Sequence, residues 1–228
     1  AALIALPDGP MALSLIDADG VAQVLPAVSP STRNAAQNGV VSIGQSIGFE
    51  GRHGWSQAWF YPPANDDFVA PQGERPPLIV HSHGGPTGFA SSAYSAEVQF
   101  WTSRGFGYLD VNYSGSSRFG RAYRNRLLGQ WGVADVEDCV DAVAAVLSAG
   151  LADPKRVSIV GGSAGGYTTL QALVTSDSFT AGVSRYGIGD LELLQRDTHK
   201  FEAHYTEALV GPYPTARDVF VERSPIHH

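Results

Sequence analysis

One stretch, residues 156–170 with the sequence RVSIVGGSAGGYTTL, constrains the fold of this chain more than any other. Its first half is a short apolar run, which predicts a buried strand of a parallel sheet. Its second half, from Tyr167 onward, predicts a helix. Between the two lies a G-x-S-x-G pattern centred on Ser163, and this pattern requires a sharp turn from strand to helix.

The residue types around Ser163 suit a turn that presents a nucleophile. Side chains two positions before and after the serine would collide in such a turn, which explains glycine at Gly161 and Gly165. The turn lifts the serine hydroxyl clear of the sheet, and the amide of Ala164 lies at the start of the helix, free to donate to an oxyanion. The pattern predicts a nucleophile elbow. A tight turn without chemistry is the alternative.

A second glycine-rich motif, HGGP at residues 83–86, follows the apolar run of residues 78–81. A glycine pair at the end of a central strand lets backbone amides point at a substrate oxygen without interference from side chains. Together with the amide of Ala164, such a loop would form an oxyanion hole with two donors. The alternative is an ordinary turn at the end of a strand.

From residue 78 onward, predicted strands and helices alternate, which indicates a doubly wound, mostly parallel sheet of α/β class. Apolar residues at helical spacing, Val136, Val140, Val143 and Leu147, form one stripe of a predicted helix. The predicted strands cover residues 78–81, 107–112, 157–160 and 181–186. The predicted helices cover residues 95–104, 121–128, 135–148 and 199–210.

Residues 1–45 have a different pattern, with short strands and turns rich in Gly and Asp. Residues 2–6 predict one strand, residues 11–25 predict a hairpin, and residues 40–43 and 46–49 predict further strands. Such a pattern is typical of a β-propeller blade or of the edge of a sandwich. A strand is also expected at residues 55–61.

The composition excludes several classes of protein. A hydrophobic content of 43% and a charged content of 16% are typical of a globular chain, and the net charge of −7 argues against nucleic-acid binding. The single cysteine, Cys139, cannot form a disulfide within the chain, and no apolar run is long enough to span a membrane. We therefore expect a cytoplasmic protein. Because the chain begins with Ala1, we expect it to be a piece of a longer one.

Several motifs together resemble the prolyl oligopeptidase family of serine peptidases, within it the branch of acylaminoacyl-peptidases and dipeptidyl aminopeptidases. These motifs are HSHGGPTG at 81–88, VNYSGSSRFGRAYR at 111–124, GQWGVADVEDCVDAV at 129–143, GGSAGGY at 161–167, and the segment from DTHKFEAHY to VERSPIHH at 197–228. The resemblance implies a β-propeller followed by an α/β-hydrolase domain. Residues 1–45 would then be the end of the propeller, and residues 46–228 the first part of an α/β-hydrolase domain that is incomplete at its C-terminus.

The resemblance also implies the catalytic roles. Ser163 matches the nucleophile, and Gly85 and Ala164 match the backbone donors of the oxyanion hole. His83 and Gly84 match residues that shape the oxyanion loop. Neither a metal nor an organic cofactor is expected, and the substrates would be short peptides cleaved near the amino end.

Three further residues match positions near the substrate. Val183 and Tyr186 match residues that line the pocket for the side chain before the scissile bond, and Tyr113 matches a loop near the site.

The remaining members of a catalytic triad are not found by match. In an α/β-hydrolase the acid and the histidine follow the serine in the chain, and we expect both beyond His228. The acidic and histidine residues after Ser163 lack the expected strand-and-loop context; they are Asp190, Asp197, Asp218, His199, His204, His227 and His228. We therefore expect the 228 residues alone to be nearly inactive. His81 and His83, two residues apart, could bind a metal, but no carboxylate or cysteine lies nearby in the sequence.

Two other functions remain open at this point. A carboxylesterase or lipase could use the same elbow and oxyanion loop, because the fold does not determine the function. A binding module without catalysis could keep the fold, although an intact Ser163 between its glycines disfavours this. We expect short peptides as the partners of this chain. We expect neither nucleic acid nor a membrane as a partner, and assembly into a homo-oligomer is left open.

Overall fold

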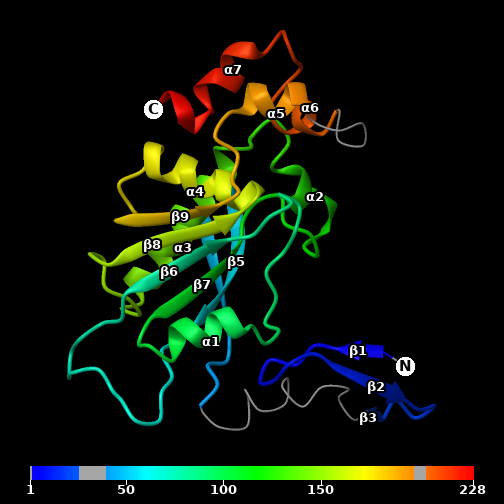
Figure 1. Cartoon of the computed structure of the whole chain (residues 1–228), viewed down its shortest axis with the longest axis vertical. Coiled ribbons are helices and arrows are strands. Elements are labelled where there is room, and N and C mark those ends of the chain that lie inside the picture. Colours follow the sequence, from blue (N-terminus) through cyan, green and yellow to red (C-terminus); the bar gives the residue numbers. More distant parts are fainter. Residues whose placement is uncertain (1, 26–39, 198–203) are drawn as a thin grey trace.

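The computed structural model describes residues 2–25, 40–197 and 204–228, whose arrangement is shown in Figure 1. The strands are β1 (Ala2–Ile4), β2 (Ala12–Ile16), β3 (Ala22–Val24), β4 (Gln45–Gly51), β5 (Gly54–Tyr61), β6 (Leu78–Ser82), β7 (Gly107–Asn112), β8 (Val157–Gly162) and β9 (Ala181–Arg185). The helices are α1 (Ala96–Thr102), α2 (Gly120–Asn125), α3 (Ala134–Ser148), α4 (Ala164–Thr175), α5 (Leu191–Asp197), α6 (Tyr205–Leu209), α7 (Arg217–Glu222) and the 3-10 helix η3 (Pro225–His227).

The larger sheet has the strand order β4-β5-β7-β6-β8-β9. β6 pairs in parallel with β7 and β8, and β8 pairs in parallel with β9. β4 and β5 join antiparallel at the other side of the sheet. The predicted doubly wound, mostly parallel sheet is therefore confirmed. Because β6, β7 and β8 are parallel, the residues that follow them, His83, Tyr113 and Ser163, leave the sheet at one shared edge.

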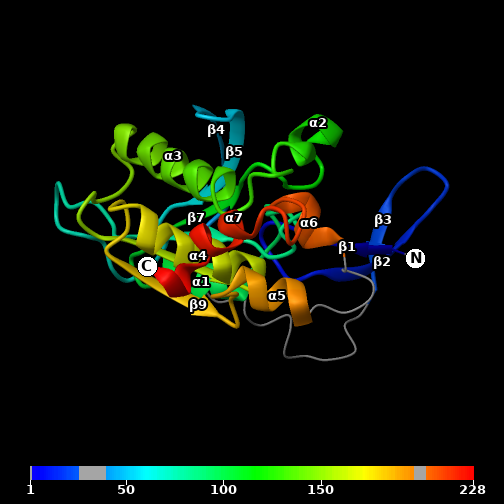
Figure 2. The same ribbon diagram turned by 90° about the horizontal axis from the view of Figure 1, so that it is seen from above.

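Helices lie on both faces of this sheet (Figure 2). α3 packs against β4 to β7, and α4 packs against β6, β8 and β9, so these two helices cover one face. α1 contacts β7, and its Val98 packs with Tyr61, Ile79 and Tyr108 on the opposite face. Alternation along each strand explains the division, because Leu78 and Val80 of β6 belong to the α3 side while Ile79 belongs to the α1 side.

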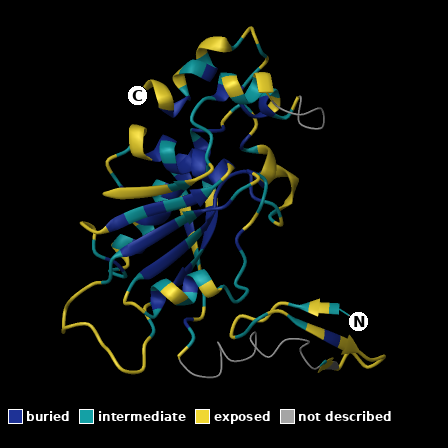
Figure 3. Cartoon of the chain, in the orientation of Figure 1, coloured by how far each residue is buried: buried dark blue, intermediate teal, exposed yellow. Residues whose placement is uncertain are grey.

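The main core lies between the sheet and α3 (Figure 3). It contains Phe60, Leu109, Val111 and Ile159 from the strands, all nearly inaccessible to solvent. The stripe predicted for α3 is only partly the buried face, because Val136 and Val143 are buried while Val140 and Leu147 are half-buried. Cys139, free and buried, lies in the same cluster, as do Ala142 and Val146. The buried face of α3 thus includes Cys139, Ala142 and Val146 in addition to Val136 and Val143.

Residues 2–25 form a separate three-stranded antiparallel sheet in the order β1-β2-β3. The predicted strand at residues 2–6 and the predicted hairpin at residues 11–25 are confirmed. Asp17 stabilises the turn because its carboxylate accepts from the amides of Asp19 and Val21. One backbone hydrogen bond, from Tyr94 N to Leu6 O, joins this sheet to the loop before α1.

The prediction of a strand at residues 40–43 is wrong. The side chain of Gln99 takes the place of a partner strand, since its oxygen accepts from Ser42 N and its amide donates to Ser42 O. The Ser42 hydroxyl donates to Pro62 O, which holds the segment in a non-strand conformation. A run of β-branched residues is therefore a weak sign of a strand where a side chain can satisfy the backbone.

The helix predicted at residues 199–210 is confirmed only as α6, and the part before residue 204 lies outside the described residues. α5 and α7 were not predicted. A cap signal for α5 is present in the sequence, because the Asp190 carboxylate accepts from the amides of Glu192 and Leu193. No helix of the described residues has both the length and the apolar character that crossing a bilayer requires.

A buried carboxylate joins the two helices that cover the main core. Asp135, in the first turn of α3, is fully buried. Its carboxylate accepts from Gly132 N at 2.6 Å and from the Thr168 hydroxyl of α4 at 2.5 Å. Burial raises the pKa of Asp135 to about 6, although both hydrogen bonds oppose the shift. The folded protein therefore holds this proton at a pH at which the unfolded chain has released it.

This raised pKa predicts a pH-dependent stability. Below pH 3.8 both states are protonated, and as the pH rises to about 6 the folded state loses up to about 3 kcal/mol of stability from this group. Asp135→Asn removes the titration while keeping an oxygen for Gly132 N. We expect the free energy of unfolding of the variant, relative to wild type, to rise between pH 4 and about 6 in urea titrations. Asp177→Asn, at an exposed carboxylate, is the control. A difference independent of pH for Asp135→Asn would contradict the prediction.

Candidate active site

The most strained residue at the shared edge of the sheet is Ser163, between β8 and α4. Its backbone has φ 55° and ψ −122°, a region that residues other than glycine rarely enter, and its side chain is exposed. The structure contains only two other non-glycine residues with positive φ among those it describes, Arg118 and Tyr186. The predicted turn therefore exists as a strained strand-to-helix junction with the serine at its tip.

The two glycines that flank this junction have no room for a side chain. A Cβ at Gly161 would lie 2.3 Å from the carbonyl oxygen of Gly165. A Cβ at Gly165 would lie 2.0 Å from the carbonyl oxygen of Ser82. The Ser82 hydroxyl, in turn, donates to Gly165 O at 2.8 Å. The end of β6 and the start of α4 are thus in backbone contact, and this contact places the loop after β6 next to Ser163.

The start of α4 provides free backbone donors. Ser163 is the N-cap, and its carbonyl accepts from Tyr167 N in the first turn. The Ala164 amide is the first of the helix, and the first amides of a helix have no partner within it. It also lies at the positive end of the helix dipole, which favours negative charge there.

The oxyanion loop, residues 83–88, lies directly against this junction. A Cβ at Gly84 would be 3.9 Å from Ser163 Cβ and 3.3 Å from the carbonyl oxygen of Gly162. Gly85 has φ 124°, a conformation that suits glycine, and a Cβ there would meet the amides of Thr87 and Gly88. The loop closes through a bond from Gly88 N to Gly84 O. Glycine at both positions brings the backbone of the loop close to the serine.

His83 anchors the oxyanion loop from below. Its ring stacks on Tyr113 with centroids 4.2 Å apart and planes 15° apart. Nδ1 donates to Gly84 O at 2.9 Å, and Nε2 lies 2.7 Å from the Ser116 hydroxyl. Burial lowers the pKa of His83 to about 4, so the ring is neutral near pH 7. The side chain therefore holds the loop without adding charge.

A second loop, residues 113–117, clamps the first, and we call it the clamp loop. The Tyr113 hydroxyl donates to His83 O at 2.7 Å. Ser117 N donates to Gly88 O, and its hydroxyl donates to Thr87 O. The clamp loop thus bonds both the beginning and the end of the oxyanion loop.

The clamp loop is itself fixed by α3. Ser114 N donates to a carboxylate oxygen of Asp138 at 2.6 Å. Burial raises the pKa of Asp138, and the hydrogen bonds from Ser114 oppose this. The other oxygen, Oδ1, is buried and has no hydrogen-bond partner among the described residues. A chain of contacts therefore leads from α3 through the clamp loop to the oxyanion loop.

On its outer side, the oxyanion loop contacts Tyr205 of α6. The Tyr205 hydroxyl donates to Gly85 O at 3.4 Å and lies 3.2 Å from the Thr87 hydroxyl.

The predicted substrate-contacting residues divide into two groups. Val183 on β9 and Tyr186 just after it are 58% and 83% exposed. The Tyr186 ring lies against Gly162, since a Cβ on that glycine would be 2.8 Å from the Tyr186 hydroxyl. Tyr186 is thus beside the elbow, whereas Val183 is level with Val160, three residues before Ser163. Tyr113 is fully buried and bonded to the loop backbone. Because Tyr113 lies under the oxyanion loop, its position favours a role in supporting that loop over direct contact with substrate.

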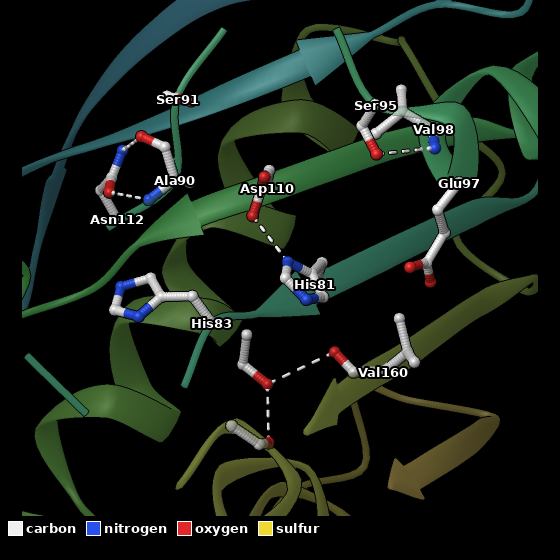
Figure 4. Close-up of polar contacts among 12 residues, drawn as sticks. His81, His83, Ala90, Ser91, Ser95, Glu97, Val98, Asp110, Asn112 and Val160 are labelled. Carbon is white, nitrogen blue, oxygen red and sulfur yellow. Dashed lines mark hydrogen bonds and ion pairs between the residues drawn. The ribbon is translucent and has the colours of Figure 1, made fainter. Parts of the chain in front are cut away.

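An acid–histidine pair, His81 on β6 and Asp110 on β7, is present in the sheet (Figure 4). His81 Nδ1 is 2.7 Å from Asp110. Burial lowers the pKa of His81, but attraction and hydrogen bonding by Asp110 outweigh burial and raise it. His81 is level with Val160, so three strand residues, about 10 Å, separate it along the sheet from Ser163. Within the described parts of the chain, no histidine forms a hydrogen bond with the Ser163 hydroxyl.

The two histidines considered as metal ligands have other partners. Figure 4 shows the His83 ring pointing away from His81, which faces Asp110. Within the described residues, no group of three or more His, Cys, Asp or Glu side chains could hold a metal ion.

Sequence reasoning missed the groups that support the site. Ser116, Asp138 and Tyr205 contact the loops described above but were not named as site residues. A signal existed for Ser116 and Asp138, since both lie within the motifs at 111–124 and 129–143 that carry the resemblance. Tyr205 also lies in such a motif, at the end of DTHKFEAHY, but nothing in that motif indicates a contact with a loop so distant in the chain.

Two curated enzymes are similar to this chain over about two thirds of its length. The acylamino-acid-releasing enzyme of Arabidopsis thaliana is 34% identical over 169 residues, which are 68% of this chain and 22% of that enzyme. The dipeptidyl aminopeptidase BIII of Pseudoxanthomonas mexicana is 36% identical over 156 residues, 66% of this chain and 23% of that enzyme. The chain therefore spans less than a quarter of the length of these relatives.

A solved puromycin-hydrolyzing peptidase of Mycobacterium tuberculosis has a similar fold. The TM-score is 0.91 with 42% identity, and the match covers 98% of this chain and 35% of that one. The α/β-hydrolase fold is thereby confirmed for the part of that fold that this chain spans. A family model described as the prolyl oligopeptidase family matches residues 92–228, which include the elbow, the clamp loop and α3. This chain belongs to the prolyl oligopeptidase family.

Proposed function

We propose that this chain carries the nucleophile and oxyanion hole of a serine peptidase that hydrolyses peptide bonds near the amino end of short peptides. The observation that carries the proposal is the strained, exposed Ser163, with the Ala164 amide beside it and the glycine-lined oxyanion loop against it. Strained backbone conformations of this kind cluster at functional sites, because a turn without a function would adopt an unstrained conformation.

The chemistry follows from this placement. The Ser163 hydroxyl attacks the substrate carbonyl while a histidine base, oriented by an acid, takes its proton. The amides of Ala164 and Gly85 stabilise the negative oxygen of the tetrahedral intermediate. Its collapse releases the amine with the proton from the histidine and leaves an acyl-enzyme, which water then hydrolyses. The base and acid are expected outside the described residues, and no step requires a metal or an organic cofactor.

The substrate class rests on the relatives. Their names include enzymes that release acylamino acids, a dipeptidyl aminopeptidase and a puromycin-hydrolyzing peptidase. We propose short peptides and related aminoacyl amides as the substrates of this chain. We propose that it acts in the cytoplasm and has no nucleic-acid or membrane partner. Assembly into a homo-oligomer is left open. We further propose that residues 1–45 end a preceding propeller and that residues 46–228 belong to the hydrolase domain; the separate sheet of β1 to β3 supports this division.

An esterase or lipase is the chief alternative, because an ester carbonyl suits the same nucleophile and donors. Family membership and the peptidase names among the relatives favour amide substrates. A binding module without catalysis would not need a strained serine, so Ser163 disfavours that reading.

Labelling by a fluorophosphonate tests the nucleophile in the full-length protein. We expect covalent labelling of wild type and none of Ser163→Ala, with turnover of aminoacyl p-nitroanilides lost by at least about a thousandfold in that variant. Ser148→Ala, at an exposed serine at the end of α3, is the matched control and should label normally. Labelling at another residue would contradict the assignment. Turnover of p-nitrophenyl esters without any turnover of amides would favour the esterase.

The clamp loop predicts a selective effect on the rate. Tyr113→Phe and Ser116→Ala each remove a hydrogen bond that holds His83, which should loosen the oxyanion loop. We expect kcat to fall about tenfold with little change in KM, which is less than the hundredfold or more that loss of a donor costs.

Tyr61→Phe is the control for these variants, since its hydroxyl also donates to a backbone carbonyl, that of Ser91. All three variants should lose about 1 kcal/mol of stability in urea titrations, but only the first two should lose kcat. Equal losses of kcat in all three would show that the effect is general destabilisation.

A further inference from the structure

An aromatic pocket lies beside the oxyanion loop, on β5 and the loops that follow β6 and β7. Its volume is about 360 Å³, within the range of pockets that bind a side chain or a small ligand. Trp55, Trp59, Phe89 and Phe119 line it. We call these four residues and Arg118 the aromatic pocket.

The uncharged amides in the pocket are already bonded. Asn112 Nδ2 donates to Gln57 Oε1 at 2.6 Å, and Asn112 Oδ1 accepts from Ala90 N. Arg118 is the one charged side chain among the lining residues that the structure describes. A ligand that enters this pocket would therefore find aromatic surface, the serines at positions 46, 91 and 92, and a single cation.

Arg118 is held in this pocket at a cost in backbone conformation. It is one of the three non-glycine residues with positive φ in the described chain, at 77°, and the other two flank or form the elbow. Its guanidinium lies 3.8 Å from the centroid of the Phe89 ring. Stacking occupies the flat face of the guanidinium and leaves its N–H groups free in the plane. No carboxylate of the described residues pairs with it, although the chain carries a net charge of −7.

The aromatic pocket lies on the same sheet edge as Ser163. Asn112 ends β7, and Phe89 follows the oxyanion loop, so the pocket begins where that loop ends. From β8, which leads to Ser163, the sheet order crosses β6 and β7 to reach β5. These three strand intervals are about 14 Å, which an extended peptide of about four residues spans.

We propose that the aromatic pocket is a substrate subsite in which Arg118 binds a carboxylate on the leaving-group side of a short peptide. This inference rests on the proposed function. A carboxylate matches the free N–H groups of the guanidinium in plane, and the aromatic walls accommodate an apolar side chain next to it. The positively charged amino end of a peptide would be repelled by Arg118, and no Asp or Glu lines the pocket to attract it. Because about four residues span this distance and one or two more precede the scissile bond, such a carboxylate would favour peptides of about five or six residues.

Kinetics in the full-length protein test the subsite. A pentapeptide that ends in phenylalanine is compared as the free acid and as the C-terminal amide. We expect kcat/KM to favour the acid about fivefold, the value of a solvent-exposed ion pair. Arg118→Ala should remove the preference, and Arg118→Lys should keep part of it. Arg124→Ala removes an exposed arginine of α2 outside the pocket and should keep it.

A further variant separates function from backbone strain. Arg118→Gly relaxes the positive φ while removing the guanidinium, so we expect it to lose the preference for the acid without any loss of thermal stability. A third substrate, the pentapeptide amide that ends in glutamate, distinguishes the two sources of a carboxylate. A rate equal to that of the free acid would show that an acidic side chain serves as well as the chain terminus.

Binding to the Ser163→Ala protein keeps this test independent of turnover. Calorimetry should give a dissociation constant about fivefold lower for the free acid than for the amide, and Arg118→Ala in the same background should equalise them. An equal affinity of acid and amide in the presence of Arg118 would overturn the proposed subsite. A third outcome separates the two proposals. If wild type binds the free acid preferentially, but hydrolyses neither peptide and is not labelled by fluorophosphonate, the binding site for the carboxylate stands and the peptidase assignment fails.

Discussion

Backbone contact between the end of β6 and the start of α4 is the constraint on which the site depends. Gly165 approaches the Ser82 carbonyl so closely that no side chain could be placed there, and the Ser82 hydroxyl bonds Gly165 O in return. This contact joins the serine junction and the oxyanion loop, which are far apart in the chain. Together with the hydrogen bond from Ser163 N to Arg185 O, it opposes relaxation of the strained conformation of Ser163.

The remaining support is arranged around His83. Its ring is neutral because burial lowers its pKa, and it bonds the oxyanion loop on one side and the clamp loop on the other. The clamp loop is fixed to Asp138 of α3, and α3 is fixed to α4 by Asp135 and Thr168. The connections therefore close into a ring that begins and ends at α4. The hydrogen-bonded polar groups in such a ring favour one geometry, although Oδ1 of Asp138 has no partner among the described residues.

Local pattern was sufficient for the elbow and for the strands of the parallel sheet, because each depends mostly on neighbours within a few residues. It also located the glycines at positions 161 and 165, although the carbonyl that excludes a side chain at Gly165 belongs to Ser82, far away in the chain. It was insufficient where partners are distant in the chain. The strand expected at residues 40–43 is absent because Gln99 binds Ser42, and Tyr113 lies under the loop because its hydroxyl reaches His83. Arg118 lies in the motif at 111–124, but nothing in the sequence indicated its backbone angle or its place over Phe89.

The backbone angle of Arg118 has a consequence for directed evolution of this protein. Glycine adopts a φ of 77° without strain, so selection for heat resistance alone should replace this arginine by glycine. Under the proposed subsite, selection for turnover of peptides with a free terminal carboxylate should restore it. One codon would then be driven in opposite directions by the two selections, which makes position 118 a sensitive reporter of which property a population of variants is retaining.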